Sequence, residues 1–398
     1  MSKYLSFYGG DRAISIIREH GLTQDMVKVV AGAAGGPKWI ILGAMDRFLF
    51  SEWFTKRSPS TAKPPSTEQP SSGSGNIDPL FLAGSSAGAW RFAAASQSDP
   101  AKSLERLAQF YIHQWYSIKP DLEEIDVECW KVLNGFIDDN SVNDILNHPY
   151  CRLSFFSVRS KWGAASDNPL LLTTTMIGAA LSNAFNRKYL KHFFERTLFY
   201  HPLDKPPFYN MDQYERSGQL NGCNRTSWFP MLKVVLNHEN FKKALLSSGS
   251  IPLVMPGVKQ IPHAPPGVYR DGGTIDYHLD IPFLGQNNNG LQKIVLFPHY
   301  TNKIVPGWLD KHLPWRKPDP CNLRNVLLIT PSQRFTQMLP GGKIPERNDF
   351  VEFKGKNRER IERWKLALKY SEILGDELCR TVNSGDISQV IQPIENIQ

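Results

Sequence analysis

The chain has 398 residues, which is enough for one large domain or two domains of ordinary size. Hydrophobic residues make up 41% and charged residues 21% of the sequence, so the chain can build a core and is not disordered throughout. No stretch approaches the roughly 18 uninterrupted apolar residues of a membrane-spanning helix. Charged residues also interrupt positions 1–20, where a signal peptide would be apolar. We therefore expect a cytoplasmic protein.

The charge balance favours anionic partners. Forty-six Lys and Arg residues against 38 Asp and Glu residues give a formal net charge of +8. Such an excess suits a phospholipid surface, a nucleic acid or an acidic substrate. Glu359 and Glu362 dilute the densest basic stretch, so no segment resembles a nucleic-acid-binding arm. We expect peripheral contact with an anionic membrane surface and no nucleic-acid partner.

The cysteines form no recognisable pattern. There are five of them, widely spaced and without a CxxC pair. This spacing is typical neither of a disulfide framework nor of a structural zinc site. We expect reduced thiols and no metal.

Two segments near the N-terminus have the same order of strand, glycine-rich turn and helix. The first has a β-rich run at 26–31, small residues at 32–38 and helical spacing at 39–50. The second has an apolar run at 80–83, followed by GSSAG and AWRFAAA. This repeated order predicts an α/β fold with three α/β/α layers and a mostly parallel central sheet. Residues 57–76 between them are rich in Ser and Pro and predict a flexible insertion.

Hydrophobic patterns predict several further elements along the chain. The expected strands are 153–158, 233–236, 267–270, 293–297 and 326–329, and the expected helices are 170–200 and 357–379.

The pentapeptide GSSAG at 84–88 is the strongest candidate for catalysis. It matches G-x-S-x-G, in which the central Ser occupies a tight strand-to-helix turn that raises its hydroxyl above the sheet. The motif alone occurs often by chance, but here an apolar run precedes it and a helix-forming run follows. Ser86 is therefore the candidate nucleophile.

The glycine-rich loop at 32–38 is a candidate anion-binding loop. Small residues allow consecutive backbone N–H groups to face a phosphate or the oxyanion of acyl transfer. Trp39 occupies the Ser/Thr position of a Walker A motif and the spacing also fails, so a nucleotide site is the weakest alternative. Since Pro37 has no N–H, the candidate donors are Gly35 and Gly36. Lys38 is a candidate for orienting the loop or a lipid phosphate, or is a plain surface lysine.

The third candidate segment is Asp271-Gly272-Gly273, which follows an expected strand. If Asp271 faces Ser86, its carboxylate can accept the hydroxyl proton directly, without an imidazole. Taken alone, an ordinary Asp-Gly turn explains this motif as well. Upstream, the apolar segment SSGSIPLVMP at 247–256 is a candidate wall of a pocket or a simple connector.

The order of these four segments resembles the patatin-like phospholipase family. AGGPK at 34–38 is similar to that family's oxyanion loop, GSSAG to its nucleophile motif, SSGSIPLVMP to its Ile-Pro segment and DGG to its Asp motif. The resemblance implies a catalytic domain over 27–300, with residues 301–398 as an extension on the same domain. It also implies a lipid acyl hydrolase that cleaves a phospholipid or another acyl ester through a Ser86–Asp271 dyad. Gly35 and Gly36 would form the oxyanion hole, and no cofactor would be needed.

The chain departs from the family pattern at several places. Ala34 and Trp39 replace glycines of the oxyanion loop, Gly249 replaces a frequent alanine, and Met255 replaces a frequent aromatic residue. Two alternatives follow.

One alternative is an α/β-hydrolase with a Ser-Asp-His triad, because His278 and His299 follow Asp271 in the required order. The other is a catalytically inactive patatin-like protein that acts in binding or as a scaffold.

Overall fold

The central feature of the molecule is one large, mostly parallel sheet. The computed structural model describes residues 3–58, 78–213, 229–285 and 292–397. Within these residues the strands follow the order β11–β1–β10–β9–β2–β3–β4–β5–β6, while β8 pairs with β4 and with β7. The strands are β1 (Leu5–Gly9), β2 (Val27–Gly32), β3 (Leu80–Ser85), β4 (Cys151–Ser160), β5 (Phe194–Tyr200), β6 (Met231–Val235), β7 (Val258–Lys259), β8 (Val268–Asp271), β9 (Ile294–Pro298), β10 (Val326–Pro331) and β11 (Gln392–Pro393).

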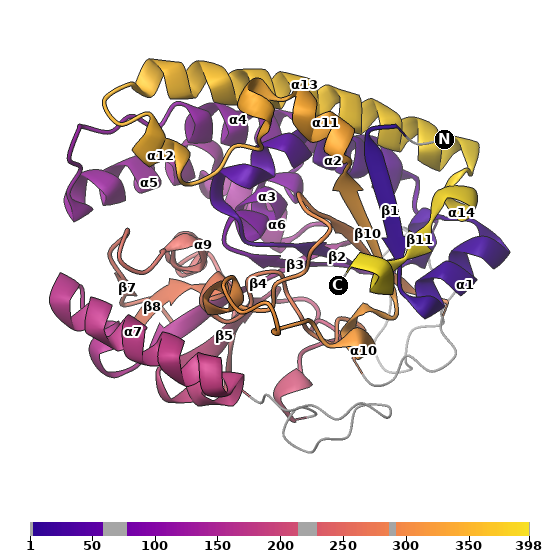
Figure 1. Ribbon diagram of the computed structural model, residues 1–398. Coiled ribbons are helices and arrows are strands. Elements are labelled where there is room, and N and C mark those ends of the chain that lie inside the picture. The colour runs from indigo at the N-terminus through magenta and orange to yellow at the C-terminus, as the bar shows by residue number, and fades with distance from the viewer. Residues whose placement is uncertain (1–2, 59–77, 214–228, 286–291, 398) are drawn as a thin grey trace.

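Helices flank this sheet on both faces, which confirms the predicted three-layer α/β/α architecture (Figure 1). The longest, α13, crosses the top of the view in yellow beside α2 and α4. The described helices are α1 (Asp11–His20), α2 (Gly43–Phe48), α3 (Ala87–Ala95), α4 (Pro100–Ile112), α5 (Leu122–Phe136), α6 (Asp139–Leu146), α7 (Pro169–Phe185), α9 (Phe241–Gly249), α10 (Pro320–Leu323), α11 (Gln333–Met338), α12 (Asp349–Glu352), α13 (Asn357–Ser384) and α14 (Ile387–Val390).

Local sequence explains where several helices begin and end. Asp99, Asp121 and Asp138 precede α4, α5 and α6, and each carboxylate accepts a backbone N–H of the first turn. Helix α13 ends at Gly385, whose φ of 74° is the left-handed conformation that glycine adopts without steric cost. The sheet's inner strands are apolar on both faces: every residue of β3 and β9 is buried. This pattern is expected for parallel strands covered by helices on both sides.

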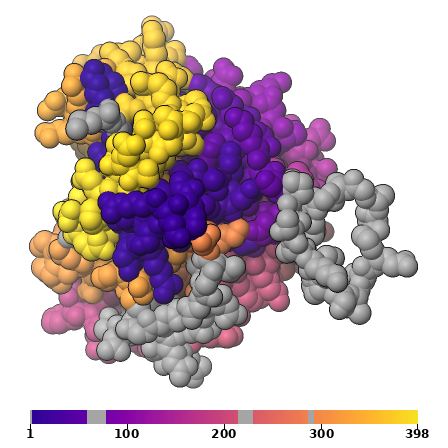
Figure 2. All heavy atoms as spheres, turned by 90° about the vertical axis from the view of Figure 1, so that its right-hand side faces the viewer, coloured from indigo at the N-terminus to yellow at the C-terminus, as the bar shows by residue number. Residues whose placement is uncertain are grey.

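Both ends of the chain belong to the sheet. Strand β10 lies between β9 and β1, and β1 pairs in parallel with β11. The Glu377 carboxylate on α13 accepts the backbone N–H groups of Lys3, Tyr4 and Leu5. Figure 2 shows the yellow C-terminal segments against the indigo N-terminal segment on one surface. Strands from both sides of the 27–300 range thus complete the same sheet.

Most predicted elements occur near their predicted positions, but the prediction of one helix was wrong for its second half. The expected strands correspond to β2, β3, β4, β6, β8, β9 and β10, and the expected helix at 357–379 lies within α13. The helix predicted at 170–200 ends at Phe185, and Phe194–Tyr200 is instead β5, which pairs antiparallel with β4. The β5 sequence, FERTLFY, is rich in aromatic and β-branched residues, which favour a buried strand.

Three further predictions concern loops, thiols and membrane spans. Most of the predicted insertion at 57–76 lies outside the described residues. Cys129, Cys151 and Cys379 are free thiols, but Cys321 is disulfide-bonded, so the expectation of reduced thiols was wrong for Cys321. Spacing along the chain could not reveal a bond between distant residues. Among the described helices, none combines the length and hydropathy that crossing a bilayer requires.

Candidate active site

Ser86 occupies a strained turn between β3 and α3. Its φ of 52° and ψ of −122° are rare for a residue with a side chain, and such strain concentrates at functional sites. Ser248 holds this conformation from the other side, because its hydroxyl accepts the Ser86 N–H at 3.0 Å and donates to the Phe156 carbonyl. Glycines permit the sharp turn: a Cβ on Gly88 would lie 1.9 Å from the Gly32 carbonyl oxygen. The backbone therefore has the form of a nucleophile elbow.

Strand pairing brings Asp271 to this turn. Strand β3 runs parallel to β4 up to the pair Ser85–Phe156, and β8 runs antiparallel to β4 with Asp271 opposite Ser157. The end of β8 therefore lies one residue beyond the end of β3. The Ser86 hydroxyl donates to Asp271 Oδ2 at 2.7 Å. Two side chains that are 185 positions apart in the sequence are thus in direct hydrogen-bond contact.

The environment of Asp271 suits a proton acceptor. Burial raises its pKa to about 6, although the hydrogen bonds from Ser86 and from the Gly273 N–H oppose this shift. Arg347 and Lys311 also favour the ionised carboxylate through their charge. A carboxylate with a pKa near 6 is ionised at neutral pH and is a stronger base than an exposed one.

The glycine-rich loop presents two backbone N–H groups beside Ser86. Gly36 has a φ of 55°, and a Cβ on Gly35 would lie 2.5 Å from the Tyr300 ring, so both positions require glycine. Within the described residues, no hydrogen-bond acceptor is recorded for either N–H. Gly35 and Gly36 also line a cavity that contains Ser86 and Asp271. Both residues therefore offer backbone donors at the cavity of Ser86, which makes them candidates for an oxyanion hole.

The loop tolerates Ala34 because other groups fix that residue. The Ala34 N–H donates to the Tyr277 carbonyl at 2.8 Å, and the Ala34 carbonyl accepts the Tyr300 hydroxyl at 2.6 Å. Its backbone has no positive φ, so a side chain costs no strain there. Ala34 thus anchors the loop, and its N–H is not available as a donor.

Lys38 follows the loop and lies beside the same cavity. Its Nζ lies 5.3 Å from the centre of the Tyr300 ring, in cation–π contact, and no carboxylate partner is recorded for it among the described residues.

Neither candidate histidine takes part in a triad. The two ring nitrogens of His278 contact the Tyr300 hydroxyl at 2.7 Å and the Val305 N–H at 2.9 Å. His299 Nδ1 contacts the backbone of Thr301. Burial lowers the pKa of both rings, that of His299 to about 3. In the described structure neither ring is hydrogen-bonded to Ser86 or Asp271, so the geometry favours the dyad over the triad.

Two cavities meet at Ser86. The larger has a volume of about 770 Å³ and is mainly apolar; its walls include Ile251, Val254 and Met255 of the segment expected to border a pocket. The smaller, about 130 Å³, contains Asp271 and the glycine loop. Ser86, Gly36, Ile251, Arg347 and Asn348 border both.

The structure adds functional candidates that sequence reasoning missed. The Ala87 N–H follows the nucleophile at the start of α3. Among the described residues it has no hydrogen-bond acceptor, so it is a third candidate oxyanion donor. The elbow motif itself could have indicated Ala87. Lys311 and Arg347 line the smaller cavity. No sequence motif marks either of them.

No metal site accompanies the dyad in the part of the chain that is described, where no group of three or more His, Cys, Asp or Glu residues could hold an ion. Comparison with family models, with curated proteins and with solved structures returned no match for this chain.

Proposed function

We propose that this protein is a carboxylic ester hydrolase that acts through a Ser86–Asp271 dyad and an acyl-enzyme intermediate. The observation that carries the proposal is the 2.7 Å hydrogen bond from the Ser86 hydroxyl to the buried Asp271 carboxylate. Its support is geometric: a strained serine, a base in contact with it and free backbone donors beside it are the parts that acyl transfer requires.

The proposed reaction has two steps. The Ser86 oxygen attacks the ester carbonyl while Asp271 accepts its proton, and the oxyanion is held by the N–H groups of Gly35, Gly36 and Ala87. Asp271 then returns the proton to the departing alcohol, which leaves an acyl ester on Ser86. Water attacks that ester while Asp271 again accepts a proton, and Asp271 then returns this proton to the Ser86 oxygen as the acid is released. No further reactant is needed.

The larger cavity supports a lipid acyl chain as the substrate's acyl group. Its volume of about 770 Å³ is within the range of ligand pockets, and mostly apolar side chains surround it. A phospholipid or another long-chain acyl ester would place its chain among Ile251, Val254, Met255 and Ile125, with the carbonyl at Ser86.

The decisive experiment is covalent labelling with a fluorophosphonate probe. We expect wild-type protein to be labelled at Ser86 and to hydrolyse acyl esters, whereas Ser86→Ala should show neither property. Ser96→Ala, which alters a buried serine at the other end of α3, serves as the matched control and should be labelled normally. Absence of labelling in folded wild-type protein would favour the inactive binding or scaffold alternative.

Helix α7 supports peripheral contact with an anionic membrane surface. Its 17 residues include no charged side chain, and Leu170, Ile177, Leu181 and Phe185 are exposed by 75%, 55%, 60% and 87%. Lys188 lies just beyond the helix and is exposed. Exposed apolar side chains next to basic residues are typical of helices that lie in a lipid interface.

Vesicle sedimentation tests this contact. Wild-type protein should bind vesicles that contain phosphatidylserine, and the double substitution Leu181→Ser with Phe185→Ser should weaken binding about tenfold or more, given the apolar area removed. Leu366→Ser, which alters an exposed leucine of α13, is the control. Equal binding by all three proteins would rule out α7 as the contact.

A further inference from the structure

We propose that Lys38, Lys311 and Arg347 bind an anionic group of the ester substrate, a phosphate or a carboxylate, next to the bond that Ser86 attacks. This inference rests on the proposed hydrolase function and narrows its substrate class to anionic esters rather than neutral glycerides.

The three cations come from separate parts of the chain and converge on one small cavity. Lys38 follows β2, Lys311 follows a short turn at Trp308–Asp310, and Arg347 precedes α12. All three line the cavity that also contains Ser86, Asp271 and the glycine loop. Lys311 and Arg347 lie outside the segments that carry the family resemblance. Their position at the site is therefore a property of this chain.

None of the three is neutralised by a partner that the structure records. In residues 3–58, 78–213, 229–285 and 292–397, no hydrogen bond or ion pair of these three side chains to a carboxylate is recorded. The ammonium groups instead face aromatic rings: Lys311 Nζ lies 4.1 Å from the centre of the Tyr277 ring, and Lys38 Nζ lies over Tyr300. A ring face attracts a cation without satisfying its hydrogen bonds, so these donors remain available to a ligand.

The cations repel one another, which is unfavourable without an anion. Although the Lys311 residue is exposed overall, desolvation of its ammonium and the charges of Lys38 and Arg347 together lower its pKa to about 8. Burial also lowers the pKa of Arg347. A bound phosphate or carboxylate would relieve this repulsion, because charge-assisted hydrogen bonds to arginine and lysine are strong in a partly desolvated site.

Among the residues that the structure describes, two carboxylates border this cavity, those of Asp271 and Glu346, one fewer than its three cations. When Asp271 accepts the Ser86 proton, its negative charge passes to the oxyanion of the substrate, so the net charge of the cavity does not change. Glu346 lies 3.9 Å from Lys343, whose ammonium is closer to Asp349 and to Glu352. The cavity therefore keeps one positive charge in excess, which a bound anion can balance.

The two cavities allow both halves of an anionic lipid ester to be bound at once. An acyl chain in the larger, apolar cavity leaves the alcohol part of the ester on the side of the smaller, cationic cavity, since Ser86 borders both. A phosphate on that alcohol would then lie among the three cations. The arrangement separates the apolar and charged parts of one substrate.

Paired substrates test the proposal. We expect Lys311→Met and Arg347→Gln each to lower kcat/KM for a monoacylglycerol phosphate by about 10- to 100-fold, the usual effect of losing one hydrogen bond to a charged group. Hydrolysis of the monoacylglycerol with the same acyl chain should fall clearly less, because the two cations affect that substrate only through the ionisation of Asp271. Lys303→Met, which removes an exposed lysine of the same loop, should affect neither substrate. The same variants are also assayed with an acyl ester of a hydroxycarboxylic acid. If the bound group is a carboxylate rather than a phosphate, the loss of kcat/KM should appear with this ester.

Equal losses on the charged and the neutral substrate would overturn the proposal, because the cations would then act on the dyad or the oxyanion. Fluorophosphonate labelling separates this failure from failure of the proposed function. If wild-type protein is neither labelled nor active, calorimetry with glycerol 3-phosphate still tests the subsite. Binding that the two variants lose would support it, and absence of wild-type binding would refute it.

The pH profile gives a second readout. The charged groups that act on the Lys311 ammonium are Lys38, Arg347, Asp271 and Glu346. It also faces the ring of Tyr277, and burial raises the pKa of that side chain to about 12. Lys311 is therefore the group that loses charge near pH 8. Wild-type kcat/KM for the phosphate ester should fall above about pH 8, and this decline should be absent with the neutral ester and in Lys311→Met.

Discussion

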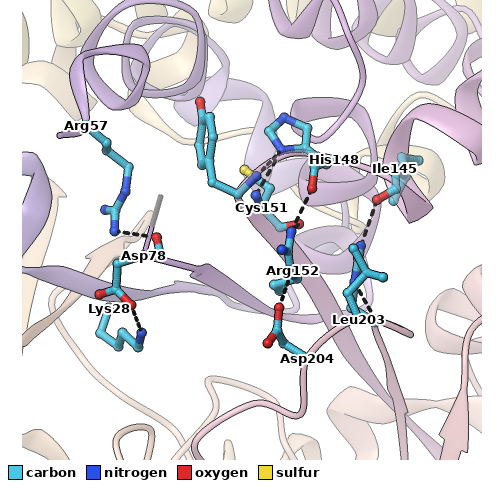
Figure 3. Close-up of polar contacts among 11 residues, drawn as sticks. Lys28, Arg57, Asp78, Ile145, His148, Cys151, Arg152, Leu203 and Asp204 are labelled. Carbon is cyan, nitrogen blue, oxygen red and sulfur yellow. Dashed lines mark hydrogen bonds and ion pairs between the residues drawn. The ribbon is translucent and has the colours of Figure 1, made fainter. Parts of the chain in front are cut away.

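The two ends of the central sheet differ in how their charged side chains are paired. At the amino ends of β2, β3 and β4, cations have partners (Figure 3). Lys28 Nζ lies 2.6 Å from Asp78 Oδ1, and Arg152 bonds Asp204 and the His148 carbonyl. Arg57 donates to three backbone carbonyls, those of Gln24, Val27 and Asp78.

The carboxyl ends of the same strands hold the candidate active site, where charges are left unbalanced. No carboxylate partner is recorded there for Lys38, Lys311 or Arg347 within the described residues, and Asp271 has a raised pKa. By contrast, the hydrogen bond and charge of Lys28 lower the pKa of Asp78 in spite of its burial. Paired charges at the amino ends stabilise the fold, whereas the cations and the raised pKa of Asp271 at the carboxyl ends fit the anion-binding role that we propose for them.

The substitution Asp271→Asn tests the unbalanced end and should have the largest effect. An amide cannot accept the Ser86 proton, so we expect ester hydrolysis to fall by at least about 10³-fold. Because the folded-state pKa of Asp271, about 6, lies above its ordinary value, ionisation costs the wild-type protein stability as pH rises from about 4 through 6. The variant should therefore be the more stable protein at pH 8, by at most about 3 kcal/mol.

Activity assays and thermal unfolding at pH 8 and pH 4 measure both effects. The stability difference should shrink at pH 4, where the wild-type carboxyl group is protonated in the folded state. A variant that keeps its activity would contradict the dyad, and one that is less stable than wild type at pH 8 would contradict the assignment of Asp271 as an unfavourable charge. Asp276→Asn is no suitable control, since Asp276 forms a buried ion pair with Arg196.

The residues of the candidate site that lie in glycine-containing turns could be predicted from the sequence. Ser86, Gly35, Gly36 and Asp271 lie in turns where glycines are needed for close approach or positive φ, and glycines are visible in a sequence. The parallel α/β arrangement was predictable for the same reason, because strand, turn and helix follow one another directly.

Features that depend on distant contacts could not be predicted. Lys311 and Arg347 occur in polar segments without periodicity, and they border the candidate site only because the fold brings residues 308–311 and 346–348 to the smaller cavity. Strand β5 was predicted as helix because its apolar residues also fit helical spacing, and only its pairing with β4 decides the matter. The bond at Cys321 is likewise set by the fold.

The substitution Asp78→Asn tests the balanced end and should have the smallest effect, opposite in sign to that of Asp271→Asn. Lys28 holds the pKa of Asp78 below its usual range, so the carboxylate contributes stability above about pH 4 that is lost as pH falls. Because the side chain is 34% exposed, we expect a loss of only about 1 kcal/mol at pH 8. Glu105→Gln, which removes one exposed negative charge from α4, should leave stability unchanged. Thermal unfolding at both pH values measures this, and ester hydrolysis should stay within twofold of wild type. A variant that is more stable than wild type would contradict a stabilising role for the Asp78 carboxylate. A variant with impaired hydrolysis would show that charges at the amino ends of the strands also affect the candidate active site.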